Sequence, residues 1–221
     1  RLCNTCNARI LELRIEHPGI WVIAEDGQPV SPRELGDGYI ALAPGERVDL
    51  LIEMTLDTGS TAAITEVSGG QRLVAGQFTY HPGELALNEL NLDSYLPLPA
   101  NPLPTKLDLA DAQAAELLME GGAMGNMVAA TYQGEKLSIR ELASKGFVWS
   151  FNGVAGMTED PLFSARLGRT VTVDLKNDTP WPHAMHLHGH HVKVIERNGQ
   201  PTGSGAWRDT VLLERQESAK I

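Results

Sequence analysis

The amino-acid sequence predicts an all-β protein of two Greek-key β-sandwich domains with one topology, the second of them truncated. Three observations support this fold class. Hydrophobic and polar residues alternate over short runs, as they do in strands that bury one face. The 221 residues include 22 glycines and 13 prolines, as is typical of many short strands joined by turns. A stretch near the start of the chain also recurs near its end.

The alternating runs give the expected strands in chain order. Residues 11–16 and 171–175 alternate strictly, and residues 48–53 alternate less cleanly. A short capped helix or turn is expected at residues 138–145, and it leads into a strand at residues 147–153. Short strands broken in this way are typical of a β-sandwich.

The recurring stretch indicates a duplicated domain. Residues 21–30, Trp-Val-Ile-Ala-Glu-Asp-Gly-Gln-Pro-Val, return 172 positions later as Lys-Val-Ile-Glu-Arg-Asn-Gly-Gln-Pro-Thr, and both copies contain a hairpin-turn dipeptide. Residues 42–50 align more loosely with residues 213–221, at 171 positions. The period is far too long for a solenoid. Since residue 221 matches residue 50 and the first copy runs to about residue 95, the second copy should be cut short by roughly 45 residues.

Residues 96–129 are expected to connect a first domain, residues 1–95, to a second, residues 130–221. The connector opens with Leu-Pro-Leu-Pro-Ala-Asn-Pro-Leu-Pro-Thr, which should be extended and semi-rigid. Residues 107–118 fit either one or two helical turns or the first strand of the second domain. Three methionines then lie in glycine-rich, flexible backbone, at Met119, Met124 and Met127. Thioether sulfur suits cuprous ion, but a mobile loop that covers apolar surface is the favoured interpretation.

Composition excludes some partners. A net charge of −10 and a pI near 5.1 argue against nucleic acid, whose binding needs a basic surface. No apolar run approaches the roughly 18 residues of a membrane span. The chain opens with Arg-Leu-Cys-Asn, so any targeting segment is expected to lie outside it. Cys3 and Cys6 form a C-x-x-C motif without the helix or the further ligands that redox or zinc sites need, and we interpret them as ordinary half-buried thiols.

A histidine cluster is the strongest functional signal. Five of the seven histidines lie within nine residues, at His183, His186, His188, His190 and His191. Side chains at i and i+2 share one face of a strand, so the second, third and fourth should point one way, and residues 192–195 should continue the strand. Neutral imidazole binds copper, zinc, iron and nickel. A metal site is favoured over an exposed histidine run because apolar residues flank the cluster.

Residues 177–213 resemble the last cupredoxin domain of a multicopper oxidase. That family has H-P-x-H-x-H-G followed by a hydrophobic strand, and this chain has Ala184 where the proline is common. Residues 1–95 resemble the middle, copper-free domain of the family, through Asp-Gly-Gln-Pro-Val and Pro-Gly-Glu-Arg-Val-Asp-Leu. The resemblance implies two cupredoxin-like β-sandwiches.

The resemblance also implies metal roles. His183 would bind a type 1 copper, His186 a type 2 copper, and His188 one copper of a type 3 pair. His190 and His191 have no ligand role in the family pattern and are interpreted as structural. The segment Trp207-Arg208-Asp209 precedes an apolar strand at residues 210–213, and a charged pair there is expected to support the site rather than to perform chemistry.

The complete protein would then be a laccase-like or cuprous-oxidase-like enzyme. It would oxidise a small reducing substrate, phenol-type or cuprous ion, one electron at a time and reduce dioxygen to water. The other ligands would come from an N-terminal cupredoxin domain of the same protein or of another subunit, and from a segment after Ile221. The chain alone is therefore expected to be inactive. The family further implies a periplasmic or secreted location.

Three alternative families make different demands on the sequence. A cupin places a glutamate about four residues after its H-x-H strand, and Glu196 lies too far from His188 for that spacing. A two-domain copper nitrite reductase would need the type 1 Cys-His-Met set in this chain. A non-enzymatic cupredoxin-like envelope scaffold would have lost its ligands, whereas three histidines are present here in the family spacing.

Overall fold

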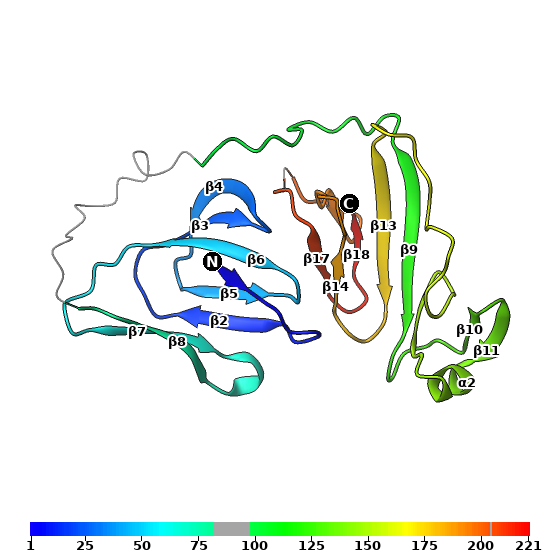
Figure 1. The fold of residues 1–221 in the computed structure, drawn as a ribbon, viewed down its shortest axis with the longest axis horizontal. Coiled ribbons are helices and arrows are strands. Elements are labelled where there is room, and N and C mark those ends of the chain that lie inside the picture. Colours follow the sequence, from blue (N-terminus) through cyan, green and yellow to red (C-terminus); the bar gives the residue numbers. More distant parts are fainter. Residues whose placement is uncertain (82–97, 204) are drawn as a thin grey trace. The chain divides into compact units, whose positions relative to one another are not determined.

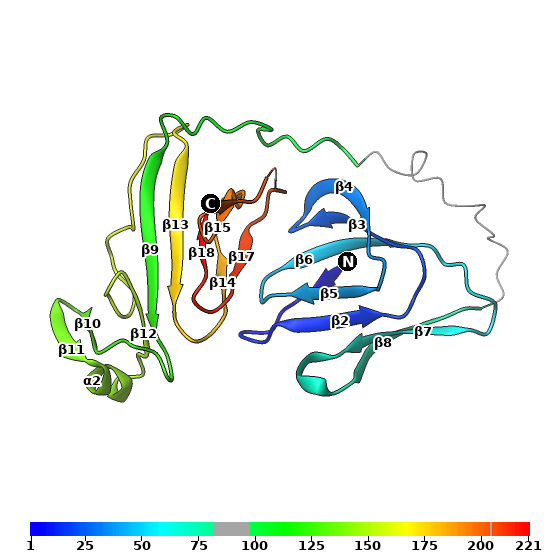
Figure 2. The same ribbon diagram turned by 180° about the vertical axis from the view of Figure 1, so that it is seen from behind.

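The computed structural model describes residues 1–81, 98–203 and 205–221, and nearly all of its regular structure is β (Figure 1; Figure 2). Within these residues α2 (Ile139–Ser144) is the one α-helix and η1 (Ser68–Gly70) the one 3-10 helix. The predicted all-β class is confirmed. No helix of the described part is long and apolar enough to cross a membrane.

The chain divides into two compact units. The first consists of residues 1–103, 186–191 and 206–210, and the second of residues 104–185, 192–205 and 211–221. Residues 82–95 of the expected first domain and residues 96 and 97 of the expected connector lie outside the described residues.

The first unit holds two four-stranded sheets with the strand orders β1-β6-β3-β4 and β5-β2-β7-β8. The strands are β1 (Leu2–Cys3), β2 (Leu11–Ile15), β3 (Ile20–Glu25), β4 (Gln28–Glu34), β5 (Tyr39–Leu42), β6 (Arg47–Ile52), β7 (Thr61–Glu66) and β8 (Leu73–Thr79). One core cluster joins Leu13, Ile40 and Leu42 of one sheet to Val22 and Val48 of the other. The two sheets therefore pack face to face as a sandwich.

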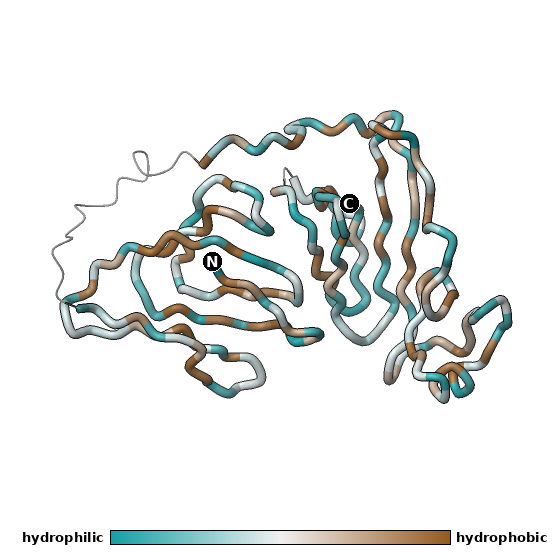
Figure 3. Tube along the Cα trace, viewed as in Figure 1, coloured by the Kyte–Doolittle hydropathy of each residue, from teal (hydrophilic) through white to brown (hydrophobic). Residues whose placement is uncertain are grey.

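The second unit is organised around a six-stranded sheet with the order β12-β9-β13-β18-β15-β16. Its strands are β9 (Gln113–Gly121), β12 (Trp149–Phe151), β13 (Val171–Asp178), β15 (Glu196–Arg197), β16 (Gln200–Pro201) and β18 (Ser218–Lys220). Within it β13 runs parallel to β9, and the other pairs are antiparallel. Figure 3 shows hydrophobic and hydrophilic residues alternating along β13, the pattern that the sequence predicts for residues 171–175.

Two smaller sheets complete the β-structure. Strands β10 (Ala129–Tyr132) and β11 (Glu135–Ser138) form a hairpin beside helix α2. That helix begins at a capping box in which the Ser138 and Glu141 side chains each accept from the other residue's backbone N–H, as the sequence predicts. Strand β14 (His183–His186) pairs with β17 (Thr210–Leu213).

The internal repeat is visible in the sheet topology. The order β1-β6-β3-β4 of the first unit recurs in the second as β13-β18-β15-β16. The pair Leu2 and Val48 corresponds to Asp174 and Lys220, each 172 residues later. The same strand order at the same sequence offset is what a duplicated domain predicts.

The two hairpin turns also share one stabilising device. Asp26 and Asn198 both have φ 48°, and the glycine after each has φ 79° or 75°, so both turns have the positive φ values of a type I′ hairpin. The Asp26 Oδ1 accepts the backbone N–H of Arg47 at 3.0 Å, and the Asn198 Oδ1 accepts that of Ser218 at 2.9 Å. In each unit the side chain of the turn residue thus hydrogen-bonds its hairpin to the neighbouring strand of the sheet, β6 in the first unit and β18 in the second.

The segment with Met119, Met124 and Met127 is not the flexible loop that the sequence predicts. Strand β9 lies within the range expected as connector, and it carries Met119, which is only 2% exposed. Met127 is 7% exposed and packs in the core around α2, whereas Met124 is 80% exposed. The mobile-loop interpretation is therefore wrong for two of the three methionines. The glycines that suggested flexibility are packed tightly: a Cβ on Gly121 would lie 2.2 Å from the Val148 carbonyl oxygen.

Two further expectations need correction. Residues 192–195 form no regular strand, because the chain turns at His188 and Gly189, where Gly189 has φ 73°. Both cysteines are free thiols as expected, but Cys3 is exposed and only Cys6 is half-buried.

Candidate metal centre

His183 begins strand β14 in the second unit and is half-buried. Its ring meets the Trp149 indole edge-on, with the ring centroids 4.8 Å apart and the planes at 88°. Its Nε2 lies 3.0 Å from the Thr179 Oγ1. Burial lowers the pKa of His183, which favours the neutral imidazole that metals bind.

The Thr179 hydroxyl determines which His183 nitrogen is free. Its single proton has two oxygen acceptors close by, the Asn177 Oδ1 at 2.7 Å and the Trp181 carbonyl at 2.9 Å. Asn177 is itself held by its Nδ2, which donates to the carbonyls of Trp181 and Glu214 at 2.7 and 2.8 Å. With the hydroxyl proton directed to an oxygen, the His183 Nε2 acts as the donor to the Thr179 Oγ1. The lone pair of Nδ1 is then available to a metal.

His186 and His188 lie together in the first unit. Their ring centroids are 4.9 Å apart and their planes cross at 76°. The His186 side chain is 40% exposed, so a ligand can reach it from solvent. Strand β14 ends at His186, and His188 approaches it because of the turn at Gly189 rather than through strand periodicity.

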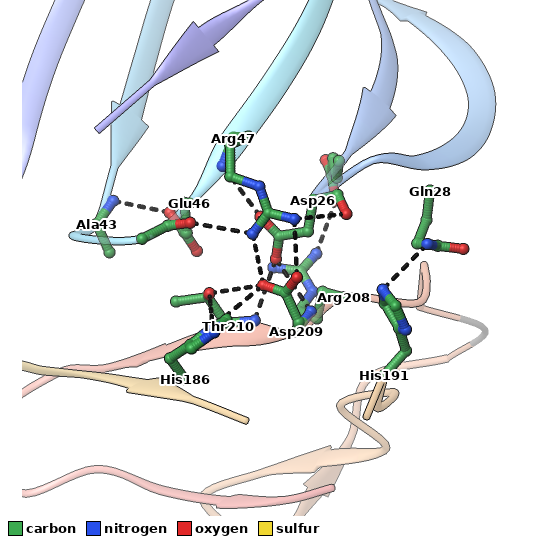
Figure 4. Close-up of polar contacts among 12 residues, drawn as sticks. Asp26, Gln28, Ala43, Glu46, Arg47, His186, His191, Arg208, Asp209 and Thr210 are labelled. Carbon is green, nitrogen blue, oxygen red and sulfur yellow. Dashed lines mark hydrogen bonds and ion pairs between the residues drawn. The ribbon is translucent and has the colours of Figure 1, made fainter. Parts of the chain in front are cut away.

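His190 and His191 do not join that pair. The His190 Nδ1 lies 3.2 Å from the backbone carbonyl of His188, and the His191 Nε2 lies 3.1 Å from the Gln28 Nε2 (Figure 4). The expectation that His186, His188 and His190 share one strand face is therefore wrong. Within residues 1–81, 98–203 and 205–221 no three His, Cys, Asp or Glu side chains gather closely enough to hold a metal by themselves.

Asp209 is the centre of a buried polar network in the first unit (Figure 4). Its two carboxylate oxygens accept from the Arg47 Nη1 and Nη2 at 2.6 and 2.7 Å. The Thr210 Oγ1 donates to the Asp209 Oδ1 at 2.8 Å and lies 3.0 Å from the His186 Nδ1. Burial alone raises the pKa of Asp209, but the hydrogen bonds from Arg47 and Thr210 and the charge of Arg47 outweigh it, so the pKa lies below its ordinary value.

Arg208, the residue before Asp209, is also held by an ion pair. The Arg208 Nη2 donates to the Glu25 Oε2 at 2.7 Å, and Glu25 also accepts from Arg33 at 3.0 Å. Both charged members of the segment Trp207-Arg208-Asp209 are thus anchored to strands of the first unit, as a supporting role predicts.

The sequence reasoning missed the residues that hold the histidines. Thr179 and Thr210 are both fully buried, and Arg47 is separated from Asp209 by 162 residues. The sequence offers one signal for Arg47 and Asp26. They lie in the Pro-Gly-Glu-Arg-Val-Asp-Leu and Asp-Gly-Gln-Pro-Val stretches, which carry the resemblance of residues 1–95 to the copper-free middle domain.

At the offset of 172 residues, His183, His186 and His188 correspond to positions 11, 14 and 16 of the first copy, and the neighbouring His17 packs in the core of the first unit. His17 is 9% exposed, stacks on Tyr80 with centroids 5.8 Å apart, and is hydrogen-bonded through its Nε2 to the Tyr80 hydroxyl. It also meets Phe78 edge-on at 6.2 Å.

Comparison with known proteins gives matches of three kinds. Residues 130–221 match a family model described as multicopper oxidase. The "Cell division protein FtsP" of Pectobacterium atrosepticum is 26% identical over 220 residues, which are 97% of this chain and 42% of that protein. The "Multicopper oxidase MmcO" of Mycobacterium tuberculosis is 40% identical over 65 residues, 29% of this chain and 12% of that protein.

Solved structures share the fold. Lac15 from a marine microbial metagenome matches with a TM-score of 0.70 and 25% identity, over all of this chain and 46% of its own. A multicopper oxidase from Campylobacter jejuni, described as a metallo-oxidase, matches with a TM-score of 0.69 over 99% of this chain and 45% of its own, at 19% identity. The chain spans less than half the length of these relatives.

Proposed function

We propose that this chain is part of a copper-dependent oxidoreductase that takes single electrons from a reducing substrate and reduces dioxygen to water, because residues 130–221 match a family model described as multicopper oxidase. A phenol-type compound or cuprous ion is the proposed reductant. In this proposal the first copper-free domain spans residues 1–95 and the copper-binding domain starts at residue 130, while residues 96–129 connect them and supply strand β9 to the sheet of the second unit. The location is periplasmic or secreted.

The observation that supports the proposal is the contact between the His186 and His188 rings, 4.9 Å apart. Imidazole nitrogen is a ligand that copper accepts, and two adjacent rings can serve one metal cluster. Copper, when bound, supplies the one-electron transfer between substrate and dioxygen. The protein holds the donors: His186 for a type 2 copper, His188 for one copper of a type 3 pair, and His183 for a type 1 copper.

The surroundings of His183 and His186 differ. His183 is half-buried against Trp149, and its pKa is lowered, so its ring stays neutral and fixed. His186 is more exposed and hydrogen-bonded through Nδ1. The remaining ligands are proposed to come from an N-terminal cupredoxin domain of the same protein or of another subunit, and from a segment after residue 221.

The test uses the complete protein that contains this chain, loaded with copper and assayed for copper per molecule and for dioxygen consumption. His186→Ala and His188→Ala should lose copper and oxygen consumption together. His190→Ala is the matched control, because it lies in the same segment without a proposed ligand role. Equal losses in the control, or a complete protein that takes up no copper, would contradict the proposal.

A second candidate is a non-enzymatic role as an envelope scaffold. It is favoured by the FtsP relatives, which match 97–100% of this chain and are named for cell division. A copper-nitrite-reductase-type protein has no comparable observation behind it. The scaffold role would be supported if the complete protein bound no copper while deletion of its gene impaired cell division. Normal division after the triple replacement of His183, His186 and His188 by alanine would show that the scaffold role does not depend on metal.

A further inference from the structure

Thr210 lies between a histidine and a carboxylate, and its hydroxyl contacts both. The Oγ1 is 3.0 Å from the His186 Nδ1 and 2.8 Å from the Asp209 Oδ1 (Figure 4). The same Asp209 oxygen is also 3.3 Å from the His186 Nδ1. Thr210 is fully buried, so these neighbours decide where its proton points.

A hydroxyl carries one proton, which can be donated to only one of the two partners. A carboxylate is a stronger acceptor than a neutral imidazole, because a hydrogen bond to an ionised group is shorter and about twice as strong as a neutral one. The Thr210 hydroxyl therefore donates to Asp209 and accepts from His186. The His186 Nδ1 also faces the carboxylate oxygen directly, where a lone pair would be repelled. Both contacts require the proton on Nδ1.

The carboxylate is fixed in turn. Arg47 binds both oxygens of Asp209 in a fork, at 2.6 and 2.7 Å. The Asp26 Oδ2 accepts the backbone N–H groups of Asp209 and Thr210 at 3.2 and 3.1 Å, which holds the start of strand β17. The backbone N–H of Leu187 donates to the Asp209 carbonyl at 2.8 Å, which keeps the end of β14 alongside.

We propose that Thr210 and Asp209 are positioning residues that keep His186 protonated on Nδ1, so that Nε2 alone presents a lone pair to a metal ion. The inference deepens the proposed copper site and rests on it for its purpose, but the tautomer itself is a property of the metal-free chain. Residues that hold the far nitrogen of a ligating histidine set both the tautomer and the ring orientation. Here the Thr210 hydroxyl contacts the far nitrogen of His186. The hydroxyl donates to the Asp209 carboxylate, which binds Arg47 of strand β6.

The experiment measures the ring nitrogens of His186 by long-range ¹H–¹⁵N NMR in the uniformly labelled 221-residue chain, above the pH at which imidazoles are protonated. The His186→Gln spectrum identifies its signals. The expected result is a protonated Nδ1 and an unprotonated Nε2, although neutral histidine in water prefers the opposite tautomer. A predominantly Nε2-protonated His186 would overturn the proposal, and this measurement needs no variant of Thr210 to fold.

Three variants test the assignment to Thr210. Thr210→Val removes the hydroxyl at constant volume and should shift His186 toward the Nε2-protonated form, whereas Thr210→Ser should retain the wild-type signals. Thr65→Val is the matched control, because Thr65 is also a buried strand residue of the first unit. Unchanged His186 signals in Thr210→Val would overturn the role of its hydroxyl.

A titration with Zn²⁺ as a diamagnetic probe separates this inference from the proposed function. Zinc should perturb the His186 Nε2 and the His188 ring, and Thr210→Val should weaken that binding by roughly 10- to 100-fold. If the Nδ1-protonated tautomer is present but zinc perturbs neither ring, the positioning role stands, and the two rings do not bind a metal without the ligands proposed to come from outside this chain. If zinc binds equally to wild type and to Thr210→Val, the positioning role fails.

Discussion

Replacing Arg47 with methionine should destabilise the first unit far more than a matched replacement at the surface. Methionine keeps much of the side-chain length but removes the guanidinium fork that binds Asp209 at 2.6 and 2.7 Å. The Asp209 side chain is 12% exposed, so its carboxylate would be left largely buried without its cation. A buried charge without a partner is costly because neither water nor protein solvates it.

The size of the effect follows from burial. Removing one partner of a fully buried ion pair costs about 3–5 kcal/mol. The Arg47 side chain is 29% exposed, so water reaches one end of the pair, and we expect a loss of about 2–3 kcal/mol in unfolding free energy. For a chain of this size each kcal/mol lowers Tm by about 2–4 °C, which gives a decrease of roughly 4–12 °C.

Arg1 provides the control. It makes the same fork to Asp49, at 2.6 and 2.8 Å, but its side chain is 58% exposed. Water screens an exposed pair, so Arg1→Met should lower Tm far less than Arg47→Met. Calorimetry and circular dichroism of both variants measure the difference. Equal decreases in Arg1→Met and Arg47→Met would refute the argument from burial, as would an additive effect of Arg47→Met and Asp209→Asn, since contacting residues should couple.

Three other predictions concern the carboxylates and the copper. In the complete protein Asp209→Asn should lower stability or copper loading more than turnover per bound copper; copper analysis with oxygen-electrode rates decides this, and the reverse result would assign Asp209 to proton delivery. The 221-residue chain mixed with Cu(II) should show neither an intense blue thiolate-to-copper band nor dioxygen consumption with phenols or cuprous ion, and a blue, oxygen-consuming sample would imply that chains complete each other's sites. The hydrogen bonds from Arg1 lower the pKa of Asp49, so their contribution is present above the ordinary value of about 3.9 and is lost as the pH falls through the folded value. The small Tm difference between wild type and Arg1→Met at about pH 7 should therefore vanish near pH 2, and a constant difference would show that the pair is not its cause.

Local patterns predicted the strands but not their interruptions. Strict alternation placed β2 and β13 correctly, because each of these strands buries one face. The same alternation predicts that the histidine strand continues past His186. In the structure β14 ends at His186 and the chain turns at Gly189. Glycine content suggested a loop around Met119, whereas Gly121 is required there by the close approach of Val148.

The sequence predicts three histidine ligands and a supporting role for Asp209, but it does not indicate the other residues that contact the histidines. The H-x-x-H-x-H spacing identified the three histidines from adjacent residues. The contacts that orient them come from Thr179, Thr210, Asp209 and Arg47, and most of these depend on strand pairing. A threonine that begins or directly follows a strand has no local signature for such a role, so the structure was needed to find it.

The parallel pairing of β9 with β13 has a consequence for how the second unit folds. Residues 113–120 pair with residues 171–178, so the two strands meet only after the intervening chain has closed a long loop. That intervening chain contains β10, β11 and α2, which are joined by short turns and share a core of Met127, Ala130, Leu142 and Ala155. Local contacts form faster than non-local ones, and each halving of a loop lowers its closure free energy by about 0.6 kcal/mol. We therefore expect the hairpin and helix to form first, which shortens the loop that must close before β9 and β13 pair.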